Sequence, residues 1–245
     1  MDAIPAYEEV TDALVLAGGR GERLRPLTDS IPKPLVEVCG KPIIQWQIEM
    51  LKANGIRNIT LSVGYMAHKI KERLGNGEKF GVRISYLVED VPLGTAGPLW
   101  LLKIQNNLPR KTFVLCNGDE LKAIRIHDVL DIHRKNEALA TIALTEIDDT
   151  RDWGVVRLVD DRILEFVEKP TPEEAPSRLI NCGFYVLEPE VADMVPPRKA
   201  SMEREIFPMI AEQRRLYGSI LKGQWFPTDT HERIKKAERE WNTVF

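Results

Sequence analysis

The sequence is poor in the residues that identify many protein classes. Its 245 residues include three cysteines and four histidines, which show neither metal-ligand spacing nor an evident catalytic partner. We therefore expect Cys39, Cys116 and Cys182 to be buried thiols in a reducing compartment. No apolar run approaches the roughly 20 residues that cross a bilayer, and the acidic segment Met1–Asp12 lacks the apolar core of a signal peptide. These absences predict a cytoplasmic protein without a membrane partner.

The sequence also lacks an excess of charge of one sign. With 34 lysines and arginines against 37 aspartates and glutamates, the formal net charge is -3, which argues against a general nucleic-acid or membrane-surface binder. Neither a Walker A loop nor the dinucleotide-binding pattern G-x-G-x-x-G is present. Hydrophobic residues make up 43% of the chain, which is ordinary for a globular protein of one large or two small domains. Any phosphate binding must therefore be local.

A glycine-rich run, Leu16–Thr28, is the most informative stretch that is present. It follows the apolar residues 13–17, which predict a parallel strand buried on both faces. Its glycines let backbone N–H groups approach phosphate oxygens without interference from a Cβ atom, and two cations add charge. These residues are Gly18, Gly19, Gly21, Arg23 and Lys33. The run predicts a nucleoside triphosphate site, and a plain glycine turn with water-facing arginines is the alternative.

Strands and helices are predicted to alternate over residues 12–138. The expected strands are 13–17, 59–63, 82–88 and 113–116, and the expected helices are 42–53, 67–74, 96–105 and 126–135. This alternation favours a mainly parallel sheet with helices on both faces. Ligands of such sheets bind at the carboxyl ends of strands, where Gly18, Glu89 and Asp119 fall.

Residues 139–245 are predicted to be richer in strands. The expected strands are 140–145, 155–159, 163–168, 180–187 and 216–221, and the expected helices are 201–212 and 231–241. Ser201 is a candidate N-cap, and Asp160–Asp161 a hairpin turn. Strand-rich segments of this kind can also be purely structural.

The run at 16–28, with the Pro-Lys-Pro at 32–34, resembles the signature of sugar-1-phosphate nucleotidyltransferases, L-A-G-G-x-G-x-R-L-x-P-L-T followed by P-K-P. The resemblance extends to about residue 237. The segments most similar to the mannose-1-phosphate guanylyltransferase group are 34–43, 92–99 and 201–208. It implies a Rossmann-like three-layer α/β/α fold with a mostly parallel mixed central sheet and a strand-rich sugar-binding subdomain. It also implies one catalytic domain, with a nucleotide-binding half at 12–138 and a sugar-phosphate-binding half at 139–245.

The resemblance implies a set of nucleotide-binding residues. They are Leu16, Ala17, Gly18, Gly19, Gly21, Glu89 and Gly94. Glu89 falls where the family reads the nucleobase. A carboxylate only accepts hydrogen bonds, so it suits the N1–H and N2–H donors of guanine and would repel the carbonyl edge of uracil or thymine. A solvated glutamate next to Asp90 is the alternative.

The family also binds Mg²⁺, and the resemblance places one ligand at Asp119, since its members carry N/S-x-D here. A turn that closes the strand is the alternative. The second family ligand is the aspartate of W-x-D-x-G-T, but residues 225–230 read W-F-P-T-D-T, with Pro227 at the ligand position. Asp229 can serve as the second metal ligand, Asp119 and the phosphates can hold the ion with water, or activity is low or lost.

On the sugar side, residues 166–170 match the family pattern F-x-E-K-P. The resemblance implies that Glu168 accepts hydrogen bonds from sugar hydroxyls and that Lys169 holds the sugar phosphate. Asn181 matches a strand asparagine that contacts the sugar, and Gly154 a glycine that lets the backbone approach it. The structural alternatives are an exposed charged pair, a strand-edge hydrogen-bonding residue and a bulge glycine.

The implied reaction needs no acid or base residue. A sugar-1-phosphate oxygen attacks the α-phosphorus of the nucleotide in line, and pyrophosphate leaves. Arg23 is assigned to the leaving pyrophosphate, Lys33 to the α-phosphoryl oxygens and Lys169 to the incoming phosphate. The expected substrates are GTP and mannose 1-phosphate. A glucose-1-phosphate uridylyl- or thymidylyltransferase and a non-catalytic nucleotide-sugar-binding regulator are the alternatives. We expect no left-handed β-helix domain of the kind that follows the catalytic domain in many relatives, which leaves the oligomeric state open, a homo-oligomer included.

Overall fold

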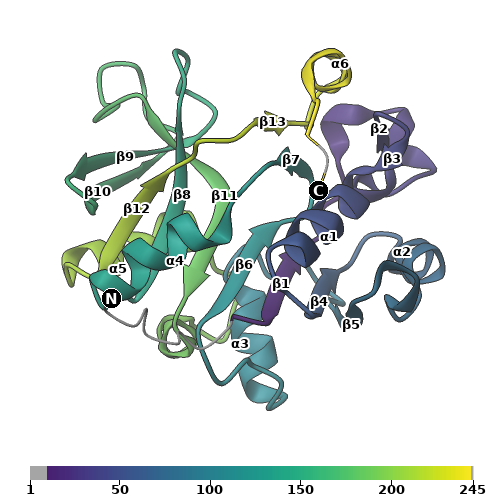
Figure 1. Ribbon diagram of the computed structural model, residues 1–245, viewed down its shortest axis with the longest axis horizontal. Helices are drawn as coiled ribbons and strands as arrows, with labels where there is room; N and C mark the ends of the chain where they lie inside the picture. Colours follow the sequence, from purple (N-terminus) through teal and green to yellow (C-terminus); the bar gives the residue numbers. More distant parts are fainter. Residues whose placement is uncertain (1–9, 244) are drawn as a thin grey trace, which may run out of the picture.

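A nine-stranded sheet forms the centre of the protein in the computed structural model, which describes residues 10–243 and 245 (Figure 1). Four parallel strands in the order β5-β4-β1-β6 make one half of the sheet. They are β1 (Asp12–Leu16), β4 (Asn58–Val63), β5 (Arg83–Val88) and β6 (Phe113–Asn117). Because they run in one direction, their carboxyl ends lie at the same edge of the sheet.

The other half of the sheet is mixed in direction. Its strands are β8 (Ala140–Glu146), β9 (Gly154–Val159), β10 (Arg162–Glu168), β11 (Leu179–Leu187) and β12 (Leu216–Ile220). β11 lies antiparallel between β6 and β8, β12 is parallel to β8, and β9 pairs antiparallel with β10. The predicted α/β fold with a mixed sheet is confirmed. In the second half β8 and β12 pair in parallel, whereas the hairpin turn at Asp160–Asp161 joins the antiparallel strands β9 and β10.

Helices cover both faces of the sheet (Figure 1). They are α1 (Ile43–Ala53), α2 (Ala67–Leu74), α3 (Gly97–Ile104), α4 (Ile126–Lys135), α5 (Phe207–Glu212) and α6 (His231–Glu240). Adjacent residues of β1 belong to two separate cores: Val15 shares one with Ile48 of α1, and Leu14 shares the other with Leu99 of α3. This follows from the alternation of side chains along a strand and gives the three predicted layers.

Several expected helices have the bounds that the sequence indicated. Those at 67–74 and 126–135 coincide with α2 and α4. The segment after Ser201 begins with a π-helical turn, Met202–Ile206, before α5. The Ser201 hydroxyl accepts a hydrogen bond from the Arg204 backbone N–H at 3.2 Å, which confirms the predicted cap. Among the described residues, no helix is long and apolar enough to cross a membrane.

Two short strand pairs were not predicted. β2 (Glu37–Val38) pairs with β3 (Lys41–Pro42), and β7 (Glu120–Lys122) pairs with β13 (Trp225–Pro227), so that Pro227 lies opposite Glu120. The second pair brings the C-terminal segment beside the end of β6.

The cysteines do not share one environment. Cys116 and Cys182 are buried as predicted, and burial raises the pKa of both thiols. Cys39 is exposed, so the prediction that it is buried was wrong. It lies in the turn between β2 and β3, where its φ of 51° and that of 74° at Gly40 form a tight hairpin turn, and its thiol lies 3.7 Å from the Glu238 carbonyl of α6.

Candidate active site

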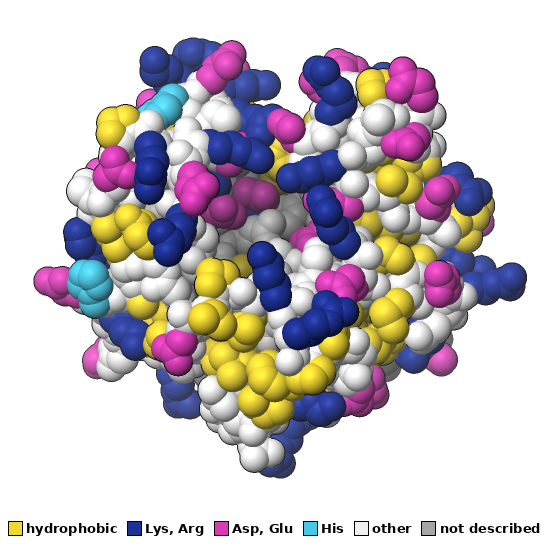
Figure 2. All heavy atoms as spheres, turned by 180° about the vertical axis from the view of Figure 1, so that it is seen from behind, with side chains coloured by type: hydrophobic (Ala, Val, Ile, Leu, Met, Phe, Trp, Pro, Cys, Tyr) yellow, Lys and Arg dark blue, Asp and Glu magenta, His cyan; other side chains and the backbone are white. Residues whose placement is uncertain are grey.

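A cavity of about 800 Å³ lies at the carboxyl ends of the parallel strands. Its lining includes every residue that the sequence assigned to the nucleotide, the triphosphate or the metal, namely Leu16, Ala17, Gly18, Gly19, Gly21, Arg23, Lys33, Glu89, Gly94, Asp119 and Asp229. Figure 2 shows a hollow on the face opposite to that of Figure 1, with acidic and basic side chains around it. The cavity therefore joins residues from five separate parts of the sequence, 16–34, 64–65, 89–95, 117–119 and 229.

Gly21 is the loop position at which the backbone conformation most clearly requires a glycine. Its φ is 64°, in the left-handed region, and a Cβ atom there would lie 2.9 Å from Lys33 Cβ. Its carbonyl accepts a hydrogen bond from the Thr28 hydroxyl at 2.8 Å. Gly19, in contrast, is exposed and has open space around it. Close packing of Gly21 therefore holds the loop against the segment that carries Lys33.

Lys33 and Asp119 form an ion pair inside the cavity. The Lys33 Nζ atom lies 2.8 Å from an Asp119 carboxylate oxygen, and only 7% of the lysine side chain is exposed. A buried ammonium group without a partner would be strongly destabilising. Asp119 is 39% exposed, and its backbone carbonyl accepts from the buried Thr228 hydroxyl at 2.6 Å. The β7–β13 pair thus fixes the turn that bears Asp119.

Arg23 is paired with Asp229, whose carboxylate also binds Arg233. The Arg23 guanidinium lies 2.5 Å from Asp229, and Arg233 donates to both Asp229 oxygens at 2.8 and 3.0 Å. Burial by itself raises the pKa of Asp229, but the hydrogen bonds and charge of Arg233 outweigh it and hold that pKa below its ordinary value. Among the described residues, no three Asp, Glu, His or Cys side chains lie together as a ready metal site.

Glu89 is held firmly at the cavity wall. One carboxylate oxygen accepts from the Ser62 hydroxyl at 2.5 Å, and the other accepts from the Leu93 backbone N–H at 2.9 Å. A Cβ atom at Gly18 would lie 3.4 Å from the first oxygen, at ordinary van der Waals distance, so Glu89 and the glycine loop lie side by side. Each oxygen retains a second lone pair, which leaves the carboxylate able to accept from a ligand.

Glu168 and Lys169 lie at the end of β10, beside the start of β9. A Cβ atom at Gly154 would collide with the Phe166 ring and lie 2.9 Å from a Glu168 oxygen. Burial, followed by the charge of Glu203, raises the pKa of Glu168, while Lys169 opposes the rise. Lys169 adopts a left-handed φ of 54°. None of the predicted sugar-side residues belongs to the cavity lining, so their role remains a prediction.

Asn181 makes two hydrogen bonds within β11. Its amide donates to the Tyr185 hydroxyl at 2.8 Å, and its side-chain oxygen accepts from the Gly183 backbone N–H at 2.8 Å. These bonds span an irregularity of the β11 pairing between Asn181 and Tyr185. They support the structural alternative for Asn181, and its contact with a sugar is not tested by them.

Three features of the site escaped the sequence reasoning. Lys122 is fully buried, donates to the carbonyl of Gly183 at 2.9 Å and pairs with Glu120 at 3.2 Å. Thr95, which lines the cavity, donates to Glu203 at 2.5 Å. The third is Arg233. Each has at least one partner far away along the chain, Gly183 for Lys122, Glu203 for Thr95 and Asp152 for Arg233, which no local pattern signals.

Known proteins resemble this chain over most of its length. The family model described as nucleotidyl transferase matches residues 12–243. Mannose-1-phosphate guanyltransferase of Pichia angusta is 43% identical over 217 residues, and the catalytic subunit beta of mannose-1-phosphate guanylyltransferase of Danio rerio is 39% identical over 216 residues. The alignments cover 86% and 87% of this chain. The chain spans 59% of the length of each relative.

Solved structures share the fold over almost the entire chain. The HddC protein of Yersinia pseudotuberculosis, complexed with GMP-PN, has a TM-score of 0.78 at 25% identity, covering 95% of this chain and 100% of that one. A UDP-glucose pyrophosphorylase complexed with UDP-glucose has a TM-score of 0.81, covering 95% and 98%, and at 20% identity it shows the fold alone. With the family match over residues 12–243, the chain belongs to the nucleotidyl transferase family.

Proposed function

We propose that this chain catalyses the condensation of GTP with mannose 1-phosphate to give GDP-mannose and pyrophosphate. The observation that carries the proposal is the gathering of a glycine loop, two cations and Glu89 in one cavity at the ends of parallel strands. The relatives that are 39–43% identical are named mannose-1-phosphate guanyl- or guanylyltransferases, which supports this choice of nucleotide and sugar.

The reaction is a transfer of the nucleotidyl group. An oxygen of the sugar phosphate forms a bond to the α-phosphorus, and the bond between that phosphorus and the pyrophosphate oxygen breaks. Lys33 neutralises the α-phosphoryl oxygens, Arg23 the leaving pyrophosphate and Lys169 the incoming phosphate. Because the Lys33 side chain is 7% exposed, its charge acts where little water screens it.

The residues present suit one protein ligand for Mg²⁺ better than two. Asp119 offers a partly exposed carboxylate in the cavity, and oxygen ligands of this kind suit the ion. Asp229 would have to give up bonds to two arginines, and the Pro227 side chain has no ligand atom. We therefore assign Asp119 as the protein residue that would hold the ion. When bound, the ion neutralises charge on the triphosphate.

A substrate panel tests the proposed function. GTP, UTP, dTTP and ATP are each combined with mannose 1-phosphate and glucose 1-phosphate, and Mg²⁺-dependent pyrophosphate release is measured. We expect the highest kcat/KM for GTP with mannose 1-phosphate. A preference for UTP or dTTP with glucose 1-phosphate would instead indicate a uridylyl- or thymidylyltransferase. Binding of GDP-mannose without release from any pair would indicate the regulatory alternative.

Glu89 is the residue proposed to select guanine. Replacing it by glutamine (E89Q) presents an amide N–H₂ group to guanine donors, so we expect kcat/KM for GTP to fall by roughly 10- to 100-fold. The value for UTP should fall less or rise. The same panel measures both, with D90N as the matched control for a neighbouring carboxylate. An equal loss for both nucleotides would show that Glu89 only anchors the loop through Ser62 and Leu93.

A further inference from the structure

Arg233 of α6 binds three groups at once, although it does not itself line the cavity. Its guanidinium donates to both Asp229 oxygens at 2.8 and 3.0 Å and to Asp152 at 2.8 Å. It also lies over the Trp153 ring, with its carbon 4.9 Å from the ring centroid. The side chain is 28% exposed. A planar guanidinium held by two carboxylates and one ring has little freedom to move.

On the nucleotide side, Arg233 acts through Asp229 on Arg23, and we call this connection the nucleotide arm. Asp229 lines the cavity and forms the 2.5 Å ion pair with Arg23. The Arg23 side chain is 58% exposed, so it has little packing of its own to fix its direction. Asp229 therefore sets the position of Arg23, and Arg233 sets the position of Asp229.

On the sugar-phosphate side, Arg233 acts through Asp152 and Trp153 on Lys169, and we call this connection the sugar arm. The Trp153 carbonyl accepts a hydrogen bond from the Lys169 backbone N–H at 2.9 Å. Lys169 has a left-handed φ of 54°, a conformation that is strained for a residue with a side chain and persists only when neighbours impose it. Trp153 is fixed by Arg233 on one side and by the Trp225 ring at 4.9 Å. The placement of Lys169 thus depends on Trp153.

We propose that Arg233 is a positioning residue that aligns the two phosphate-binding sides of the site, through Asp229 toward Arg23 and through Asp152 and Trp153 toward Lys169. The proposal rests on the proposed function, since it takes Arg23 and Lys169 as ligands of different substrates. It also gives Asp229 a role other than metal binding.

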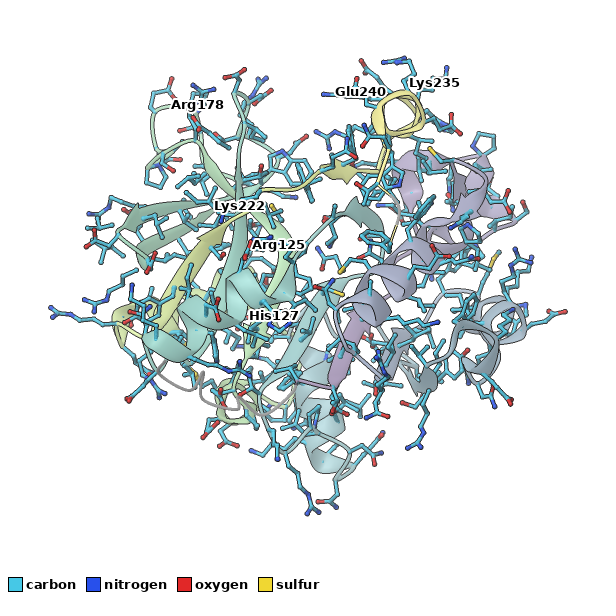
Figure 3. All side chains as sticks on the ribbon, viewed as in Figure 1. Arg125, His127, Arg178, Lys222, Lys235 and Glu240 are labelled. Atoms are coloured by element: carbon cyan, nitrogen blue, oxygen red, sulfur yellow. The ribbon has the colours of Figure 1, made fainter. Side chains whose placement is uncertain are left out.

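Three variants separate the two arms. D229N cuts only the nucleotide arm, so we expect the KM for GTP to rise roughly 10-fold with the KM for mannose 1-phosphate unchanged. D152N cuts only the sugar arm and should give the opposite split. R233Q cuts both and should raise both KM values. K235Q is the control, because Lys235 lies on the same helix and points away from the molecule (Figure 3), and it should behave as the wild type.

A purely structural role for Arg233 would lower the melting temperature and the amount of active protein while leaving both KM values unchanged, and that result overturns the proposal. If R233Q does not fold, D152N and D229N still decide, since equal effects of both on the two substrates contradict separate arms. If the wild type shows no turnover, the proposed function fails. Equilibrium binding of GTP and of mannose 1-phosphate to the same variants then replaces the KM values, and a wild type that binds neither ligand overturns both ideas.

Discussion

At Glu168 the folded state favours a neutral carboxyl group, whereas the proposed binding of sugar hydroxyls requires an ionised one. Burial and the charge of Glu203 raise its pKa, which means that the folded state disfavours the ionised form. The stability contribution of Glu168 is therefore greatest in acid and is lost as pH rises through this raised pKa. We expect E168Q to have a higher melting temperature than the wild type at pH 7.5 and a higher KM for mannose 1-phosphate. A melting temperature of E168Q below that of the wild type would contradict the raised pKa. A KM for mannose 1-phosphate below that of the wild type would contradict a carboxylate that binds sugar hydroxyls.

The pH dependence of sugar-phosphate binding tests the same carboxylate. As pH falls, protonation of Glu168 should raise the KM for mannose 1-phosphate, starting at a higher pH than for an ordinary glutamate. Replacing Glu203 (E203Q) removes the nearby negative charge and lowers the pKa of Glu168, so the rise should begin at lower pH. Titration of the substrate phosphate is common to both proteins and cancels in the comparison. Identical profiles would exclude Glu168 as the titrating group.

Individual site residues could be predicted where the residues that act together lie close to one another in the sequence. Gly21 and Lys33 belong to one short signature, and the structure brings them into contact. Arg233 has no such signal, because its partner Asp152 lies 81 positions away. Its i, i+4 contact with Asp229 looks like an ordinary surface pair until the fold places Trp153 beneath it.

Among the secondary-structure elements, hydrophobic periodicity located the long helices and missed the short strands. The helices α2 and α4 were bounded correctly, since each presents a regular apolar face. β7 and β13 have three residues each, too few to show a repeat. The pairing of Pro227 with Glu120 was therefore seen only in the structure, although this pairing fixes the turn that contains Asp119.

A partly buried polar cluster links α4 to the end of β11. The His133 ring bonds the Thr141 hydroxyl at 2.9 Å and Glu188 at 3.0 Å, and Thr112 donates to Glu188 at 2.6 Å. The hydrogen bond to His133 holds the pKa of Glu188 below its ordinary value of 4.5. A lowered pKa means that the stabilisation is present above that ordinary value and is lost as pH falls through the lowered one.

We therefore expect E188Q to be less stable than the wild type by about 1–2 kcal/mol at pH 7, with a difference that shrinks below pH 4.5, the ordinary pKa of the group. Urea unfolding at several pH values measures it, with the exposed neighbour Glu190 replaced (E190Q) as the control. A difference that stays constant from neutral to acid pH would show that the Glu188 charge contributes nothing.

For the whole molecule, the sequence predicted the layers but not the order of strands. β11 comes late in the chain yet lies between β6 and β8, a placement that depends on contacts far apart in sequence. This insertion joins the predicted halves, 12–138 and 139–245, into one sheet. It also explains why Gly183 of β11 lies close to Asn117 of β6, where a Cβ atom at Gly183 would collide with the asparagine side chain.

The charges of the cavity as a whole predict that metal and nucleotide bind cooperatively. Each proposed phosphate-binding cation of the cavity is paired with a carboxylate, Lys33 with Asp119 and Arg23 with Asp229. Metal alone must compete with Lys33 for Asp119, and a metal-free triphosphate meets two carboxylates that repel it. When both bind, Asp119 gains a cation and Lys33 gains an anion, so each ligand should raise the affinity for the other.

We expect Mn²⁺, used as a paramagnetic probe for Mg²⁺, to bind the free protein at least about 10-fold more weakly than the protein with GTP, after correction for the Mn²⁺·GTP complex in solution. Electron paramagnetic resonance measures the free ion in each case. In D119N the protein-dependent part of this gain should disappear, whereas in D229N it should persist, because Asp229 of the wild type is bound to arginines and is not assigned as a metal ligand. Loss of the gain in D229N alone would instead make Asp229 the metal ligand and Arg233 its competitor.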